Sequence, residues 1–189
     1  MSLWRRQRNT YENRAEADLP LAADADDPAA HEAAVGRQKY AELVYRAGYK
    51  SARYWCEKDA KRYGLSGVAL FGHCLARVSR AGWGRFELVA SDLAGARADV
   101  RLAPSAFVLA QAGTCAATKI CYLLSGWLDG VMGGVGERIK GAGGAALETL
   151  CCETQCAADG HSHCVFAVRP RAVGRADAAA GANRHAPTS

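Results

Sequence analysis

The chain has 189 residues, half of them hydrophobic and 23% charged, which is the size and composition of one globular domain with flanking segments. Its net charge of +5 includes many arginines near the two ends, without interleaved aromatic residues, so a nucleic-acid partner is not expected. No stretch approaches the roughly 18 uninterrupted apolar residues that a membrane-spanning helix needs.

Composition divides the chain into three parts. Residues 1–34 are polar, charged or alanine-rich, and we predict a flexible N-terminal arm there. Residues 35–170 carry periodic apolar patterns and are predicted to form the folded domain. In residues 171–189, glycine and proline recur among charged residues, which predicts a disordered tail.

Three helices are predicted from apolar residues at helical spacing. The first begins after Gly36 and ends at Gly64, and the second covers Val68 to Val78. A long apolar helix follows from a capping Ser105 to about Val131. The glycine-rich stretch Gly133–Gly144 lacks the Gly-Lys-Ser/Thr ending of a phosphate loop, so we interpret it as a flexible connector.

Four strands are predicted between and after these helices. Alternating residues from Phe86 to Ala90 indicate the first strand, and a second at Asp99–Leu102 is expected to stop at Pro104. The segments Ala146–Cys156 and Cys164–Arg169 are expected to form a final antiparallel pair. The order of helices and strands is typical of an α+β fold.

The last hairpin carries a candidate metal site. Cys156 and Cys164 bracket a short turn, and Glu153 lies three residues before the first of them. A carboxylate and two thiols held together are three of the four ligands of a tetrahedral zinc site. Residues three apart on a regular strand face opposite sides, so a bulge must separate Glu153 from Cys156 if both contact one metal. Cys121, from the preceding helix, is a candidate for the fourth ligand.

Alternatives to this ligand set are open. Cys151 shares a strand face with Glu153, and His161 and His163 occupy the turn, so each is another candidate for the fourth position. The thiols can also be ordinary buried side chains. The N-terminus lacks the apolar core of a signal peptide, so we expect a cytoplasmic protein, in which eight cysteines favour metal binding over disulfides.

These features together resemble the 4-vinyl-reductase (4VR) domain family. The resemblance covers about residues 36–169 in order and includes the segments Tyr45–Gly48, Gly82–Glu87 and Val100–Phe107. The single residues that carry it are Cys121, Gly126, Gly130, Glu153, Cys156, Gly160, Cys164 and Phe166.

The resemblance implies a fold similar to the vesicle-tethering TRAPP subunits, with a twisted four-stranded antiparallel sheet packed with helices and often a homodimer. It implies a structural zinc held by Cys121, Glu153, Cys156 and Cys164. It also implies a buried pocket for a small aromatic molecule, as in the sensor domains of phenol- and xylene-responsive activators. Candidate pocket residues are His73, Trp83, Phe107, Tyr122 and Trp127.

We therefore expect a stand-alone binding module, a sensor or carrier of a small hydrophobic or aromatic molecule, whose signal output would need a partner protein. One alternative is a role in bacteriochlorophyll biosynthesis, as an accessory protein or a component of vinyl reduction. Another is a scaffold for protein contacts. A catalytic zinc is not expected, because four protein ligands leave no position for water.

Overall fold

The computed structural model describes residues 28–110, 118–140 and 148–171, and the chain divides into two compact units, Met1–Tyr40 and Ala41–Ser189. In the first unit, helix α1 (Pro28–Val35) lies within the segment predicted as a flexible arm; residues 1–27 are outside the described part. Gly36, at φ 81°, separates α1 from α2 (Arg37–Tyr63). Arg37 pairs with Glu32 across this junction at 2.6 Å.

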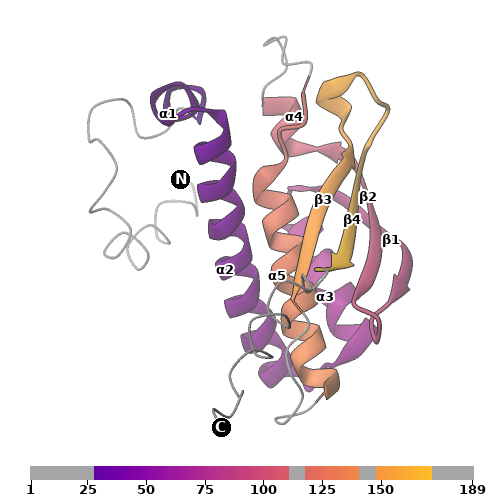
Figure 1. The fold of residues 1–189 in the computed structure, drawn as a ribbon. Coiled ribbons are helices and arrows are strands. Elements are labelled where there is room, and N and C mark those ends of the chain that lie inside the picture. Colours follow the sequence, from indigo (N-terminus) through magenta and orange to yellow (C-terminus); the bar gives the residue numbers. More distant parts are fainter. Residues whose placement is uncertain (1–27, 111–117, 141–147, 172–189) are drawn as a thin grey trace, which may run out of the picture. The chain divides into compact units, whose positions relative to one another are not determined.

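The second unit is built on one antiparallel sheet in the order β1-β2-β4-β3 (Figure 1). Its strands are β1 (Gly84–Asp92), β2 (Arg97–Ser105), β3 (Thr149–Gln155) and β4 (Cys164–Pro170). β2 and β4 are central, and their alternate residues are buried on one face. The predicted α+β fold with a four-stranded antiparallel sheet is confirmed.

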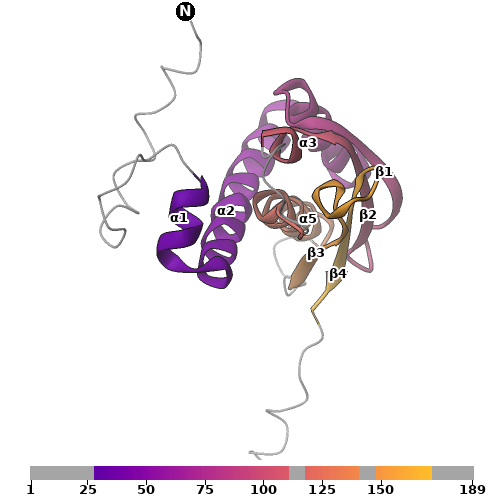
Figure 2. The ribbon, with the colours of Figure 1, turned by 90° about the horizontal axis from the view of Figure 1, so that it is seen from above.

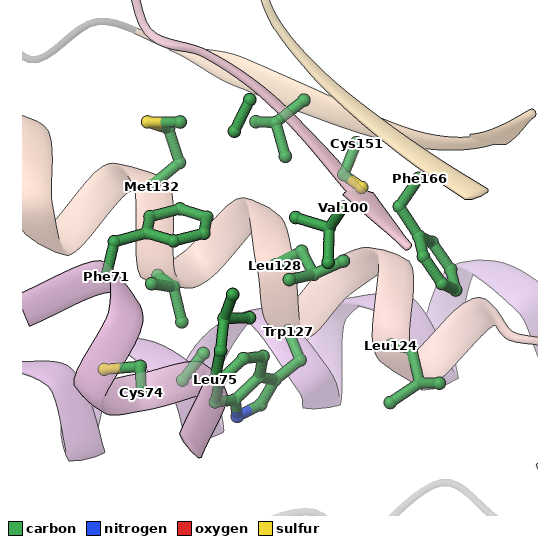
Figure 3. Close-up of a cluster of buried hydrophobic side chains, with 14 of the residues drawn as sticks. Phe71, Cys74, Leu75, Val100, Leu124, Trp127, Leu128, Met132, Cys151 and Phe166 are labelled. Carbon is green, nitrogen blue, oxygen red and sulfur yellow. The ribbon is translucent and has the colours of Figure 1, made fainter. Parts of the chain in front are cut away.

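Helices cover this buried face of the sheet. α3 (Gly67–Arg80) and α5 (Tyr122–Lys140) contact the strands, and α5 lies between the sheet and residues 41–63 of α2 (Figure 2). The short α4 (Ala106–Ala110) follows β2 directly. The core forms where side chains of α3 and α5 meet the strands, and Figure 3 shows Phe71, Leu128 and Phe166 among them. Burial of these apolar surfaces is the main stabilising contribution to such a unit.

Glycines allow α2 and α5 to pack backbone against backbone. A Cβ atom at Gly126 would lie 2.6 and 2.8 Å from the carbonyl carbon and Cα of Tyr45. A Cβ atom at Gly130 would lie 2.9 Å from the Ala52 Cβ atom. Real Cβ atoms almost never come within 3.0 Å of such neighbours, so larger residues at these positions would force the two helices apart.

The first two helices occur where the sequence predicts them, and α2 ends before Gly64 at φ 64°. Three other expectations are corrected. The predicted helix from Ser105 to about Val131 is not continuous: Ser105 ends β2, α4 ends at Ala110, and α5 begins at Tyr122. Pro104 does not stop β2, which continues to Ser105. The predicted glycine-rich connector is helical as far as Lys140, because Gly133 and Gly134 pack closely against side chains of α2; residues 141–147 are outside the described part.

Candidate metal centre

Four buried side chains from three segments converge at one end of the sheet. Cys121 immediately precedes α5, and its carbonyl oxygen accepts the Ser125 N–H at 3.0 Å, as the residue before a helix does. Glu153 lies on β3, Cys156 follows that strand, and Cys164 begins β4. One potential ligand atom from each of Cys121, Glu153, Cys156 and Cys164 lies within 4.8 Å of the other three.

A strand irregularity brings Glu153 and Cys156 to the same site. Glu153 pairs with Phe166, but Gln155 pairs with the adjacent Val165, so β3 contains a bulge between them. The bulge required by the sequence is therefore present. Cys121 lies just before α5 rather than within a helix, which corrects the expectation that a helix would supply it.

The alternative fourth ligands lie elsewhere. Cys151 is buried on β3 outside the cluster, and its N–H donates to the Tyr45 hydroxyl at 3.0 Å. His161 is exposed at the hairpin tip, and the His163 Nδ1 atom lies 2.8 Å from the Ser162 hydroxyl. Among the described residues, Cys121 is thus the fourth member of the cluster.

Contacts within the protein itself position the four side chains. The Cys121 N–H donates to Glu153 Oε2 at 3.2 Å, and the Ala157 N–H donates to Cys164 Sγ at 3.4 Å. The sulfur of Cys164 lies 4.0 Å from the sulfurs of both Cys121 and Cys156. Glu153 Oε1 is buried and has no hydrogen-bond partner among the described residues. An orphaned carboxylate oxygen is costly in a buried site, and a bound cation is one group that would satisfy it.

The thiols differ in acidity because of their neighbours. A hydrogen bond from the Cys121 thiol lowers the pKa of Cys164, and the same bond raises the pKa of Cys121 above its ordinary value. Burial raises the pKa of Cys156 to about 12. Without a cation, Cys121 and Cys156 therefore hold their protons at neutral pH. Metal binding at this cluster would have to release those protons.

Three of the predicted pocket residues form an aromatic cluster. The ring of Trp83, just before β1, lies 5.7 Å from Phe107 of α4 and 6.5 Å from Trp127 of α5, both edge-on. Trp127 is buried, and the other two rings are half-buried. Tyr122 is half-buried in the first turn of α5, beside Cys121. Such edge-to-face contacts are favourable beyond the area that the rings bury.

His73 belongs to a different cluster. Its Nε2 atom lies 3.1 Å from the buried Asp59 carboxylate, which also accepts two hydrogen bonds from Arg77. Its ring packs on Tyr63, 5.0 Å away, rather than on the aromatic cluster. Two surface hollows lie on β1 and β2, and neither is lined by a residue of the aromatic cluster.

Two sets of buried contacts were not predicted. Ser105, expected to cap a helix, is buried with its Oγ atom 3.7 Å from Cys121 Sγ. The Tyr45 hydroxyl donates to Asp129 at 2.8 Å, and Asp129 also accepts a hydrogen bond from Thr149. These contacts join residues far apart in the chain, and no local spacing in the sequence indicates them.

Comparison with known proteins supports the fold. The family described as a domain of unknown function (DUF5943) matches residues 24–89, about a third of the chain. No curated protein matches the sequence. In the described part of the chain, no helix is both long and apolar enough to cross a membrane.

Two solved structures are similar to this chain to different degrees. The phenol-responsive sensory domain of the transcription activator PoxR, solved with phenol, superposes with a TM-score of 0.61 at 18% identity, covering 76% of this chain and 70% of that one. A trafficking protein particle complex subunit 3 from Naegleria fowleri, covalently bound to palmitic acid, has a TM-score of 0.47 at 13% identity, covering 78% and 84%. The first likeness shows that this chain and the PoxR sensory domain share a fold.

Proposed function

We propose that the chain is a sensor or carrier domain that binds a small hydrophobic or aromatic molecule beside a structural zinc centre. Cys121, Glu153, Cys156 and Cys164 would hold the zinc. The observation that carries the proposal is the convergence of three thiols and a buried carboxylate whose Oε1 atom has no hydrogen-bond partner among the described residues.

The donor set fits zinc. With Zn–S bonds of about 2.3 Å, the sulfurs of a tetrahedral site lie about 3.8 Å apart. The Cys164 sulfur lies 4.0 Å from the sulfurs of Cys121 and Cys156. The Ala157 N–H bond to Cys164 favours the thiolate form that a metal requires. Bound zinc would cross-link the segment before α5 to the β3–β4 hairpin, so its binding energy would contribute to folding. Four protein ligands leave no position for a catalytic water, which favours a structural role.

The aromatic cluster supports the ligand part of the proposal. Trp83, Phe107 and Trp127 come from three segments of the chain, and their rings pack edge to face on one another. The PoxR domain, which shares this fold, was solved with phenol. An apolar aromatic molecule that inserted among these rings would replace edge-to-face contacts with similar ones. The proposed ligand is therefore a small aromatic molecule of about one ring.

Metal analysis of the purified chain under reducing conditions tests the zinc centre. We expect about one zinc per chain, since the cluster offers one tetrahedral set. Cys156→Ser should remove the metal and lower the melting temperature. Cys152→Ser is the matched control, because Cys152 belongs to the same hairpin but is exposed. Absence of metal from the wild-type protein, or equal metal content in the two variants, would refute the zinc centre.

Ligand binding is tested separately. Native mass spectrometry should detect a small molecule carried by the protein, and phenol should change the tryptophan fluorescence in a saturable way. Trp83→Phe should weaken that response, whereas Trp55→Phe should not, because Trp55 lies outside the aromatic cluster under Arg77. If no small aromatic molecule co-purifies and phenol changes nothing, the ligand proposal fails while the zinc centre still stands.

Other expectations from the sequence stay predictions: the homodimer, the partner protein for signal output, the cytoplasmic location, the bacteriochlorophyll role and the scaffold role. The bacteriochlorophyll role predicts that the protein elutes with a pigment and consumes a reduced nicotinamide cofactor. The scaffold role predicts a filled core that binds no small molecule. The same mass spectrometry and phenol titration therefore separate the three functions.

A further inference from the structure

Ser105 joins the metal centre to the aromatic cluster. It is the last residue of β2, is buried, and places its hydroxyl oxygen 3.7 Å from Cys121 Sγ. A hydroxyl that faces a thiolate donates a hydrogen bond to it and fixes the sulfur's position. Ser105 therefore brings a buried hydroxyl from the sheet to the sulfur of one member of the cluster.

The backbone on both sides of Ser105 is held tightly. Ser105 pairs with Gly84 across β1 and β2, and the next residue, Ala106, donates its N–H to the Trp83 carbonyl at 3.1 Å. Gly84 has φ 129°, and a Cβ atom there would lie 2.6 Å from Leu102 Cδ1, so the two strands approach closely at this point. Phe107 follows within α4 and packs on Trp83. A displacement at Ser105 therefore has to move the aromatic cluster.

We propose that Ser105 is a positioning residue that ties the start of α4 to the Cys121 ligand, so that metal occupancy controls the order of α4 and of the aromatic cluster. This inference rests on the proposed zinc centre, and it makes the metal a regulator of ligand binding as well as a structural cross-link. The binding free energies of metal and ligand are then linked, and each raises the affinity for the other by the same factor.

Hydrogen exchange on the full chain, with and without zinc alone, tests the link without knowledge of the ligand. Zinc should slow amide exchange in peptides that cover residues 105–110 of the wild-type protein, as well as in the β3–β4 hairpin. In Ser105→Ala, zinc should still protect the hairpin but no longer protect residues 105–110. Chelator competition should show zinc affinity reduced about 10- to 100-fold, the usual effect of removing a group that orients a ligand.

Two further variants isolate the hydroxyl-to-sulfur contact. Ser125→Ala removes another buried hydroxyl, which donates to the carbonyl oxygen of Cys121 rather than to its sulfur, and it should behave as the wild type. Ser105→Thr keeps the hydroxyl and should restore protection of residues 105–110. If zinc protects the hairpin but not residues 105–110 of the wild type, or if Ser105→Ala matches Ser125→Ala, the inference is overturned and the zinc centre stands. If the wild type binds no zinc, the proposed function itself has failed.

Discussion

The contact between α2 and α5 gives the sharpest prediction about stability. Gly126→Ala would add a Cβ atom 2.6 and 2.8 Å from the carbonyl carbon and Cα of Tyr45. Both are backbone atoms, so no side-chain rotation relieves the overlap and the helices must separate. Gly136→Ala, in the same helix, is the matched control, because a Cβ atom there has no neighbour within 4 Å.

The two substitutions should change stability in opposite directions. Overpacking against a backbone costs about 3 kcal/mol, the upper end of the usual range, which outweighs the better helix propensity of alanine. Replacing an unhindered helical glycine with alanine stabilises by about 1 kcal/mol. Subtracting about 1 kcal/mol of helix propensity leaves a net loss of about 2 kcal/mol for Gly126→Ala. For a protein of this size, each kcal/mol shifts Tm by about 2–4 °C, so Gly126→Ala should lower Tm by about 4–8 °C and Gly136→Ala should raise it by about 2–4 °C.

Thermal unfolding followed by circular dichroism, on both variants and the wild type at one metal concentration, measures these shifts. Urea unfolding of the same samples checks that the slope of free energy against denaturant is unchanged, so that the shifts report stability. If Gly126→Ala is as stable as Gly136→Ala, the two helices are not in backbone contact and the packing described for α5 is wrong.

Three further predictions concern the interior. Tyr45→Phe removes the hydroxyl that bonds to both Asp129 and the Cys151 N–H, and it should lower the unfolding free energy by about 1–3 kcal/mol. Tyr63→Phe is the control and should change the unfolding free energy little, because the Tyr63 ring is half-exposed. Burial raises the pKa of Asp129 in the folded state, so its contribution to stability is present at low pH and is lost as pH rises from the ordinary carboxyl value through the raised one. Urea unfolding of Asp129→Asn at several pH values should therefore show a smaller loss of unfolding free energy as pH rises. An unchanged pH dependence would mean that the Asp129 pKa is not raised in the folded state. Zinc added to the metal-free chain should release protons, because the buried thiols lose their protons when they bind the metal. The release is measured as a fall in pH in weakly buffered solution, and no release would mean that the thiols are not ligands.

The sequence predicts local features of this protein well. Helix α2 begins after Gly36 and ends before Gly64 because glycine terminates helices at low conformational cost. The hairpin spacing of Glu153, Cys156 and Cys164 implies a bulge, and β3 contains one. These features depend on residues close together in the chain.

Longer-range features were misread for a physical reason. The glycines from Gly133 to Gly136 suggest flexibility when read alone, since glycine is unfavourable in an isolated helix. In the folded chain they lie in α5, where a Cβ atom at Gly134 would lie 2.7 Å from Cys56 Sγ of α2, and this close packing stabilises the helix more than the low propensity weakens it. Packing against a helix that is distant in the sequence thus outweighs the low helical propensity of these glycines.

What the sequence by itself determined is the α+β class, the hairpin and the set of thiols and carboxylate able to bind a metal. Tertiary structure alone decided that Cys121 rather than Cys151 completes the cluster. The Cys121 backbone N–H donates a hydrogen bond to Glu153, which lies 32 residues away in the chain. Tertiary structure also decided that Ser105 contacts the Cys121 sulfur and that Tyr45 bonds to Asp129, 84 residues away. Side chains from distant segments meet only when the sheet and helices pack, so no local spacing could specify these contacts.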